Sequence, residues 1–504
     1  MLRKYILGMK RLSVLIFCFL TFALQGVPQT QDALCDVSTS GLPVCVRANG
    51  GKFHVQGLAY DEQAQCMYFS FTSAFFKTDM EGNVMASIAD INGHIGAMTF
   101  DKESRRVIAS LEIKDDAIGR NIARKLGQEA WSREQAGFYL AVIDVDRLTR
   151  MDMKQEEVMT LVRLEEVCSD YQANVDVGDK ALEHSFACSG IDGVTIAPAF
   201  GEQSCGAEEK MRGRNSNCGN ISCTRNCGAE VAMNVRAGKI GSNRCTRNSG
   251  AEVATNVRTC SCASNSCAQN CGEHQRYVYV AYGVYGDTTR TDNDYNVLLA
   301  YRLEDVLAHS HNVSSSSLCG YLLPQTLEKD LRAASLTYDG DYAAPLDNRS
   351  SSDKNDSCSN SLQPLFHVHK YFVHTGNTEW GVQNLAYDSS TNQMFLAVYK
   401  GSKSRWPNYD LFALDMNQQA FSAPLEGVPY SNSPVEQLEV SGAWYFRWGS
   451  TGLCPLGDGS YYISHNGASD GNNYCEACLY RWQGSSSPEI SPFVPAADAP
   501  SGGE

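Results

Sequence analysis

The segment Trp380-Gly-Val-Gln-Asn-Leu-Ala-Tyr-Asp388 contains the pattern that decides the fold, because four other stretches of the chain repeat its spacing. Val, Ile or Leu stands at the third position of all five, and Leu, Met or Val at the sixth. The other four stretches are Phe53-His-Val-Gln-Gly-Leu-Ala-Tyr-Asp61, Gly93-His-Ile-Gly-Ala-Met-Thr-Phe-Asp101, Ser189-Gly-Ile-Asp-Gly-Val-Thr-Ile-Ala197 and Thr451-Gly-Leu-Cys-Pro-Leu-Gly-Asp-Gly459. A repeat of this kind indicates one domain built from similar units, so the length of the chain does not by itself imply several domains.

Each motif is followed by a polar turn, or in the third repeat by a long insertion, and then by a run of aromatic and β-branched residues, which is typical of a β-strand. These second strands are expected at Met67–Phe71, Val107–Leu111, Tyr277–Ala281, Met394–Val398 and Tyr461–Ser464. Third strands are expected at Phe75–Asp79, Phe138–Val145, Asn296–Leu303, Tyr409–Met416 and Leu479–Gln483. Fourth strands are expected at Val84–Ile88, Val158–Leu164 and Lys370–His374, with weaker signals around Ala420 and Ile490.

Four-stranded units repeated along a chain predict the blades of a β-propeller, because one small sheet cannot bury both of its faces alone. We therefore expect an all-β, five-bladed β-propeller over residues 42–495. The alternative is a six-bladed ring, with a degenerate blade inside residues 304–366. Pro43-Val-Cys-Val46 is expected to complete the last blade and so remove an open sheet edge.

The chain resembles uncharacterised secreted bacterial propeller proteins in stretches such as Cys188-Ser-Gly-Ile-Asp-Gly193 and Tyr371-Phe-Val-His-Thr-Gly376. The resemblance covers most of the chain outside the insertions. It implies the propeller fold and supplies no activity.

Residues 1–26 have the pattern of a cleaved secretory signal, in which a basic start precedes a short apolar run. The apolar run, Leu12–Leu24, is shorter than the ~20 residues that a membrane span needs. An uncleaved signal anchor is the alternative. We expect a secreted, extracellular monomer without a membrane span after cleavage. The net charge of −15 argues against nucleic acid as a partner.

The chain has 20 cysteines, and in an exported protein these favour disulfides. Nine of them lie between Cys205 and Cys271, in an insertion at residues 202–272 that is expected to be disordered or held only by disulfides. Its irregular cysteine spacing does not favour zinc. A second irregular insertion spans residues 304–366. Cys475 and Cys478 are interpreted as a strained local disulfide or two free thiols.

A short amphipathic helix is expected within residues 117–135, where Ile118, Ile122, Leu126 and Trp131 share one face. It would form either a lid over the channel mouth or an ornament packed on the rim.

The start of each motif should lie near the central channel of the ring. The second motif positions are His54, His94, Gly190, Gly381 and Gly452, and the fourth are Gln56, Gly96, Asp192, Gln383 and Cys454. His54, His94 and Asp192 suit a metal ion, which is the cofactor that these residues suggest. The alternative is that these polar groups satisfy one another and channel waters.

Loops between second and third strands open on the same face of a propeller. Together with the motif starts, they supply further candidate ligand-binding residues: Glu112, Asp287, Arg290, Trp380, Lys400, Trp406, His465 and Asn466. Asp287, Asp292 and Asp294 do not match a calcium loop, because the glycine and distal glutamate are missing, so a solvated charged loop is expected.

These residues predict binding of a small molecule, glycan or peptide on this face. The alternative is a hydrolase on the same face, with two carboxylates ~5–9.5 Å apart as in glycosidases, or with a metal ion that activates water. No Gly-x-Ser-x-Gly or His-Glu-x-x-His motif marks a nucleophile or a zinc helix. Whether the protein is an enzyme stays open at this level.

Overall fold

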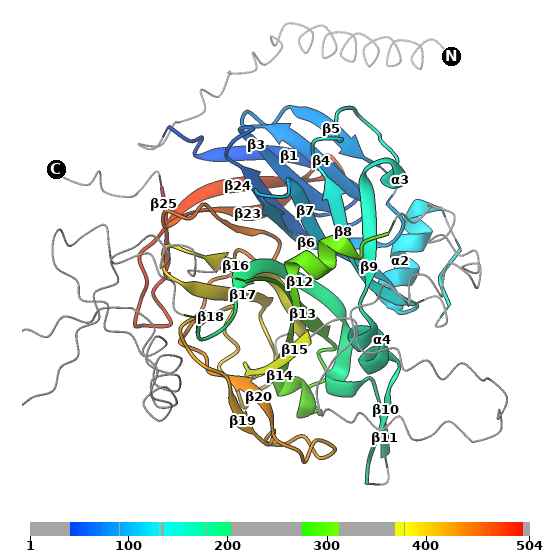
Figure 1. The fold of residues 1–504 in the computed structure, drawn as a ribbon, viewed down its shortest axis with the longest axis vertical. Coiled ribbons are helices and arrows are strands. Elements are labelled where there is room, and N and C mark those ends of the chain that lie inside the picture. The colour runs from blue at the N-terminus through cyan, green and yellow to red at the C-terminus, as the bar shows by residue number, and fades with distance from the viewer. Residues whose placement is uncertain are drawn as a thin grey trace, which may run out of the picture.

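The computed structural model describes residues 41–496, except for residues 90, 128, 133–135, 179, 203–274, 312–367 and 377–378. Within these residues five sheets follow one another around a ring, and the protein is a five-bladed β-propeller (Figure 1). The five-bladed prediction is confirmed. The six-bladed alternative is wrong, because the fifth sheet closes directly onto the N-terminal strand.

The blades are numbered here in chain order. Blade 1 contains β2 (Gly57–Asp61), β3 (Cys66–Phe71), β4 (Ala74–Asp79) and β5 (Val84–Ile88); blade 2 contains β6 (His94–Asp101), β7 (Arg106–Ile113), β8 (Gly137–Asp144) and β9 (Met159–Arg163). Blade 3 contains β12 (Cys188–Pro198), β13 (Arg276–Val284), β14 (Tyr295–Arg302) and β15 (Val368–His374). Blade 4 contains β16 (Glu379–Asp388), β17 (Gln393–Tyr399), β18 (Leu411–Asp415) and β21 (Gly442–Trp444). Blade 5 contains β22 (Leu453–Pro455), β23 (Ser460–Ser469), β24 (Asn472–Trp482) and β1 (Cys45–Gly51).

The N-terminal strand β1 closes the ring, as the sequence predicts. It pairs antiparallel with β24, from Cys45 opposite Cys478 to Gly51 opposite Asn473. The short strand β25 (Phe493–Pro495) pairs with the other end of β24. The weak signal at Ile490 therefore lies just before a strand, and Ile490 itself is 62 % exposed.

The expected outer strand near Ala420 does not belong to blade 4. β19 (Phe421–Ala423) pairs with β20 (Val435–Leu438), and β20 adds in parallel to β15 at the edge of blade 3. The fourth strand of blade 4 is instead β21. The free edge of β15 offers backbone donors and acceptors to this hairpin, which the local pattern around Ala420 does not reveal.

A small residue recurs on each second strand where it meets the inner strand. These residues are Ser70, Ser110, Ala281, Ala397 and Ser464. Ser70 Oγ donates to Gly96 O at 2.7 Å, and Ser110 Oγ donates to Asp192 O at 2.9 Å, so each hydroxyl ties its blade to the next. Side-chain-to-backbone hydrogen bonds of two serines thus link blade 1 to blade 2 and blade 2 to blade 3.

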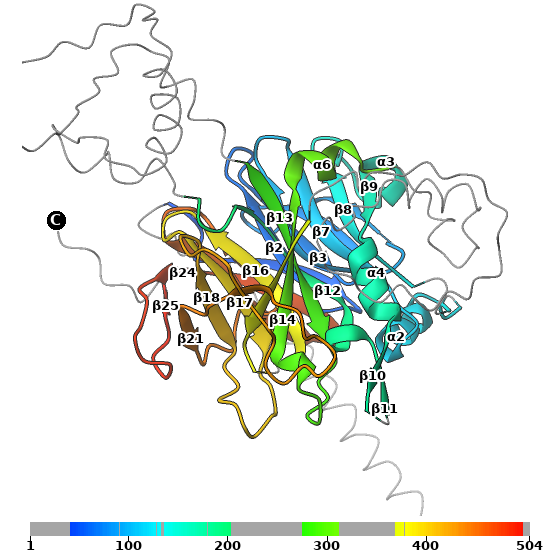
Figure 2. The same ribbon diagram turned by 60° about the horizontal axis from the view of Figure 1, so that its bottom comes forward.

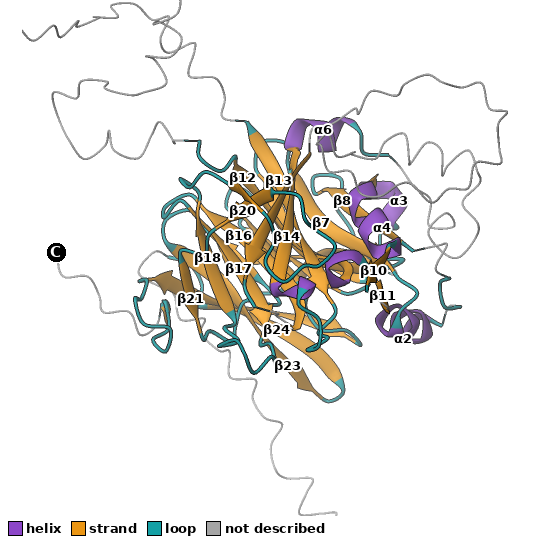
Figure 3. Ribbon diagram, turned by 90° about the horizontal axis from the view of Figure 1, so that it is seen from below, coloured by secondary structure: helices purple, strands orange, loops and turns teal. Residues whose placement is uncertain are grey.

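Helices gather beside blades 2 and 3, where α4 (Glu165–Gln172) lies against β12 (Figures 2 and 3). The predicted amphipathic helix is α2 (Ala117–Leu126), which begins at the Asp116 cap and ends at Gly127. It is shorter than expected, and Trp131 lies beyond its end although its side chain is buried. Ile122 and Trp131 pack into the core shared by blades 1 and 2, which favours the rim ornament.

The remaining elements are short: α3 (Gln155–Val158), α6 (Leu303–Ala308), the 3-10 turns η2 (Ser185–Ala187) and η3 (Asp292–Asp294), and the hairpin of β10 (Asn174–Val177) and β11 (Lys180–Glu183). Helix α6 occupies the start of the predicted 304–366 insertion. The rest of that insertion and nearly all of residues 202–272 lie outside the described residues. Within the described part of the chain, no helix combines the length and apolarity of a membrane span.

The seven cysteines in the described ranges are unpaired thiols in this structure. Cys475 and Cys478 lie on one strand, where Cys475 is opposite Ala48 and Cys478 is opposite Cys45. Residues three apart on a strand point to opposite faces. A local disulfide between Cys475 and Cys478 is therefore excluded, and the free-thiol alternative matches the structure.

Candidate functional site

The motif starts are shaped by β-bulges that sequence alone did not reveal. Register shifts fall between Ile95 and Met98 in blade 2, between Ile191 and Val194 in blade 3, and between Val382 and Asn384 in blade 4. A bulge re-aims the side chain at its extra residue. These shifts coincide with the fourth motif positions, which include Asp192 and Gln383.

Three blades contribute to one set of contacting side chains, which we call the channel cluster: His94, Glu112, Lys114, Asp192 and Gln383. His94, Glu112 and Asp192 each present one ligand-type atom, and these atoms all lie within 4.8 Å of one another. Gln383 Nε2 donates to Asp192 Oδ2 at 3.0 Å and to the carbonyl of Trp380 at 2.9 Å.

Glu112 lies at the base of the channel cluster and is fully bonded. Its Oε1 accepts the Ile191 N–H at 2.6 Å, and its Oε2 accepts from His94 Nδ1 at 3.1 Å. Lys114 Nζ lies 2.8 Å from the same Oε2. Glu112 is only 1 % exposed and Lys114 only 4 %, so their opposite charges neutralise each other beneath the opening.

Burial, and then the negative charge of Glu112, raise the pKa of Asp192 to about 7, against the opposing effects of His94, Lys114 and Gln383. Burial alone would lower the pKa of Lys114, but the carboxylates of Glu112, Asp116 and Asp192 raise it above its usual value. The pKa of Asp192 therefore lies near neutral pH, where an ordinary aspartate is fully ionised.

A second group of polar side chains lies beside the cluster. Gln56 Nε2 donates to His54 Nε2 at 2.9 Å and also contacts Thr72 Oγ1 at 3.4 Å. Desolvation, followed by the nearby His94 and Lys125, lowers the pKa of His54 to about 4, so the imidazole is neutral at pH 7. In blade 5, Thr451 Oγ1 donates to Asn466 Oδ1 at 2.6 Å.

The metal set predicted from sequence is only partly assembled. His94 and Asp192 are close together, but the third member of their group is Glu112, while His54 is bonded to Gln56. Both Glu112 oxygens are occupied, and the Lys114 ammonium already supplies positive charge at 2.8 Å. A divalent cation would have to displace that ammonium, so the donor set fits a metal poorly.

The structure keeps several predicted ligand-binding residues apart from the channel cluster. Arg290 forms an ion pair with Asp292 at 2.6 Å, and Asp287 binds Thr289 in the same loop. Trp406 packs edge-on against His374 at 4.7 Å. The remaining two are His465, which stacks on Trp448 at 3.9 Å, and Lys400, which lies 5.5 Å from the Tyr445 ring.

The expectation of a solvated charged loop holds for the exposed Asp287 but is wrong for Asp292 and Asp294. Asp292 is 1 % exposed and Asp294 5 % exposed. Lys403 Nζ binds Asp294 at 2.6 Å and Arg405 binds it at 2.7 Å. Asp294 is buried against the cations of the neighbouring 400–409 loop, which the spacing of the aspartates cannot show, whereas Asp292 is paired with Arg290 of its own loop.

Sequence reasoning missed Lys114 and Tyr399. Strand β7 continues to Ile113, two residues beyond the expected end, so Ser110, Glu112 and Lys114 follow one another with strand alternation. That alternation was readable in the sequence. Burial, and then the charge of Asp192, raise the pKa of Tyr399 to about 12, which locates this phenol near the cluster.

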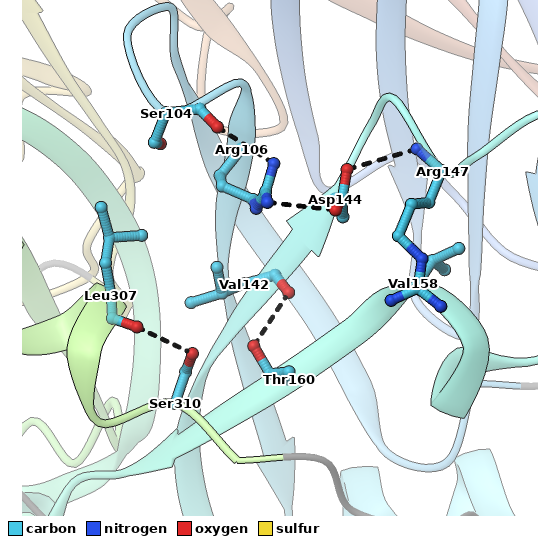
Figure 4. A pocket seen from close by; sticks show the side chains of 9 residues that line it. All are labelled: Ser104, Arg106, Val142, Asp144, Arg147, Val158, Thr160, Leu307 and Ser310. Atoms are coloured by element: carbon cyan, nitrogen blue, oxygen red, sulfur yellow. Dashed lines mark hydrogen bonds and ion pairs between the residues drawn. The ribbon is translucent and has the colours of Figure 1, made fainter.

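A separate surface cavity of about 350 Å³ lies on blade 2, between β8, β9 and the end of α6 (Figure 4). Arg106 and Asp144 form an ion pair across it at 3.0 Å, and Thr160 Oγ1 donates to Val142 O at 3.5 Å. None of the predicted site residues lines this cavity. Its ionisable lining residues are Arg106, Asp144 and Arg147, with neither a histidine nor a second carboxylate, so the channel mouth is the stronger candidate site.

No family model matches the chain, and no curated protein matches it significantly. Solved structures that resemble it are propellers. The β-propeller domain of Cps50 (Swd1) from Myceliophteria thermophila shares 7 % identity and a TM-score of 0.23, over 85 % of this chain and 99 % of that chain. The PQQ domain of pyranose dehydrogenase from Coprinopsis cinerea shares 10 % identity and a TM-score of 0.22, over 88 % and 96 %. Such scores carry no argument about function.

Proposed function

We propose that this protein binds a small uncharged polyhydroxylated molecule, a sugar or glycan, at the mouth of the propeller channel. The observation that supports this most strongly is the contact of Asp192 with Gln383 beside His94. These three side chains and Gln56 are each 7–9 % exposed, whereas Glu112 and Lys114 lie deeper. A carboxyl, an amide and an imidazole offer both acceptors and donors for hydroxyl groups.

Charge balance favours a neutral ligand. The Glu112–Lys114 pair cancels, His54 is neutral at pH 7, and Asp192 is close to half-protonated there. The mouth therefore has no strong excess of either sign. Trp380, whose carbonyl accepts from Gln383, is 37 % exposed and offers an aromatic surface of the kind that stacks on sugar rings.

The test is calorimetric titration of the full chain with neutral mono- and oligosaccharides. Gln383→Ala removes one donor, and we expect binding to weaken about tenfold, which corresponds to ~1.4 kcal/mol. Asp470→Asn is the matched control, because this exposed turn residue has φ 52°, a conformation that Asn tolerates. Absence of any neutral-sugar binding, or preference for phosphorylated or acidic ligands, would refute the proposal.

One observation favours a second function, glycoside hydrolysis. Oxygens of Glu112 and Asp192 lie within 4.8 Å, and Asp192 has the raised pKa of a general acid. Glu112 would then be the nucleophile, although its oxygens are occupied by Ile191, His94 and Lys114. Recognition without chemistry fits that occupancy better. Release of the aryl group from chromogenic glycosides, lost in Asp192→Asn, would favour the hydrolase instead.

We further propose that the protein acts outside the cytoplasm as a monomer. The basic start and short apolar run of residues 1–26 support export. N-terminal sequencing of the secreted chain should find cleavage near residue 26, and light scattering should give a single-chain mass. An intact N-terminus on a membrane-bound chain would instead identify a signal anchor.

A further inference from the structure

The two ends of the propeller meet at a pair of thiols. Cys45 on β1 lies directly opposite Cys478 on β24, and their sulfurs are 3.8 Å apart. The adjacent pair is bonded, because the Leu479 N–H donates to the Val44 carbonyl at 2.8 Å. Since bonded and non-bonded pairs alternate along antiparallel strands, Cys45 and Cys478 form a non-hydrogen-bonded pair.

This position suits a covalent bond between the strands. Cα atoms of a non-hydrogen-bonded pair lie about 4.5 Å apart, and disulfides span Cα separations of about 4.4–6.8 Å. Rotation of the two side chains can therefore bring the sulfurs together without movement of the backbone. Both cysteines are partly exposed, so an oxidant can reach them. The neighbouring Cys475 is fully buried on the opposite face.

The surroundings of the pair favour thiol exchange. The hydrogen bond from the Cys478 thiol, which outweighs the opposing effect of burial, lowers the pKa of Cys45. Among the charged neighbours, Arg47 also lowers it and Glu476 opposes it. The thiolate is the nucleophilic form of cysteine, and a lowered pKa makes more of it. Cys45 is therefore the thiol that attacks the oxidant, and Cys478 is the thiol that then resolves the mixed disulfide.

We propose that Cys45 and Cys478 form a cross-strand disulfide that fastens the N-terminal strand to the last blade. Cys45 attacks one sulfur of a disulfide oxidant such as oxidised glutathione, breaking its S–S bond and releasing one glutathione thiolate. Cys478 then gives up its proton and attacks the Cys45 sulfur, which releases the second glutathione. Two protein thiols are oxidised, and one glutathione disulfide is reduced to two thiols.

This bond would add a covalent link where the two ends of the chain close the ring. Strand β1 is held to blade 5 by backbone pairing and by surface contacts: Arg47 lies 3.4 Å from Glu476 and 3.9 Å from the Tyr474 ring, and exposed ion pairs contribute little to stability. The two cysteines are 433 positions apart, so their bond would close almost the whole propeller. A disulfide restricts the unfolded chain more as the loop that it closes becomes longer.

The experiment uses the full chain, first reduced and then equilibrated with oxidised glutathione. Remaining thiols are alkylated, the protein is digested without reduction, and peptides are identified by mass spectrometry. We expect the peptide containing Cys45 joined to the peptide containing Cys478, with loss of two hydrogens. Cys475→Ala is the matched control and should keep this linkage, whereas Cys45→Ser should abolish it.

The melting temperature gives a second readout, independent of ligand binding. Oxidation should raise the Tm by roughly 3–6 °C in the wild-type chain. Cys45→Ser cannot form this bond but keeps every other cysteine. The rise in Tm that is due to the Cys45–Cys478 bond should therefore be absent from this variant. Alkylation of Cys45 and Cys478 after oxidation, a stable mixed disulfide with glutathione at Cys45, or an equal Tm rise in Cys45→Ser would overturn the proposal.

Discussion

Replacement of Asp192 by Asn tests the electrostatics of the channel cluster directly. Asn keeps the shape of the side chain and an oxygen that can accept from Gln383, but it cannot ionise. In the wild-type protein the pKa of Asp192 is about 7, against an ordinary value of 3.8. The folded state therefore holds a proton that the unfolded chain releases between these two values.

The sign of the effect follows from that difference. Between pH 3.8 and about 7 the folded wild-type protein binds more protons than the unfolded chain, so its free energy of unfolding falls as the pH rises. Well inside this window each pH unit costs about 1.36 kcal/mol, and the slope is halved at the folded-state pKa, so the change from pH 5 to pH 7 costs about 2 kcal/mol. At pH values well above the folded-state pKa, Asp192 is ionised in both states, and its titration no longer changes the free energy of unfolding.

The assay is denaturant unfolding of both proteins at several pH values between 5 and 8. His94, Glu112, Lys114 and Tyr399 face Asp192 and are present in both proteins, so the difference reports how the whole cluster responds to the loss of this one carboxyl. We expect the advantage of Asp192→Asn over wild type to grow by about 2 kcal/mol from pH 5 to pH 7, and to level off above that range. A difference that stays constant or shrinks over this range would refute the raised pKa. Asp470→Asn should show no such trend.

Three further substitutions test how the site is built, each by denaturant unfolding. Gly190→Ala should lower the free energy of unfolding by about 3–5 kcal/mol, because φ is +129° and a Cβ would lie 1.9 Å from Glu112 Oε1. Gly178 also has a positive φ but no neighbour within 4 Å, so Gly178→Ala should cost only about 1 kcal/mol. Equal losses in the two variants would contradict the clash with Glu112. Lys114→Met should lower the free energy of unfolding by about 3–5 kcal/mol, because Glu112 stays buried without its cation. Adding Glu112→Gln to the same chain should restore much of that stability. If it restores none, Lys114 stabilises the fold by packing alone. Asn384→Ala should lower the free energy of unfolding by about 2–4 kcal/mol, because Asn384 Nδ2 donates to the carbonyls of Gln56 and Ser450 at 3.1 Å each. A loss below about 0.5 kcal/mol would show that these carbonyls find other donors.

The outer strands show where local sequence reasoning succeeds and where it fails. Strand β5 has the predicted bounds, Val84–Ile88, because a short β-prone run bounded by turn residues carries its own signal. The run near Ala420 has a similar composition but joins blade 3 through β20. An edge strand accepts any suitable partner within reach, so its neighbour depends on the path of the whole chain.

The candidate site divides in the same way. Position in the repeat was sufficient to place His94, Asp192 and Gln383 at the ring centre, since equivalent residues of successive blades occupy equivalent positions. It was not sufficient to place Lys114 beside Glu112, because that contact depends on two further residues of strand in β7. Arg290 was expected to face a ligand, yet it forms an ion pair with Asp292 of its own loop.

The sequence by itself predicted five blades, the inner three strands of each blade and the closure by the N-terminal strand, because hydrophobic period and turn residues are local properties that repeat. Only the tertiary structure decided which polar groups meet in the channel and which become buried ion pairs. It also decided that Cys478 faces Cys45 and not Cys475. Those outcomes depend on bulges and strand register, where a shift of one residue turns each side chain to the other face of its sheet.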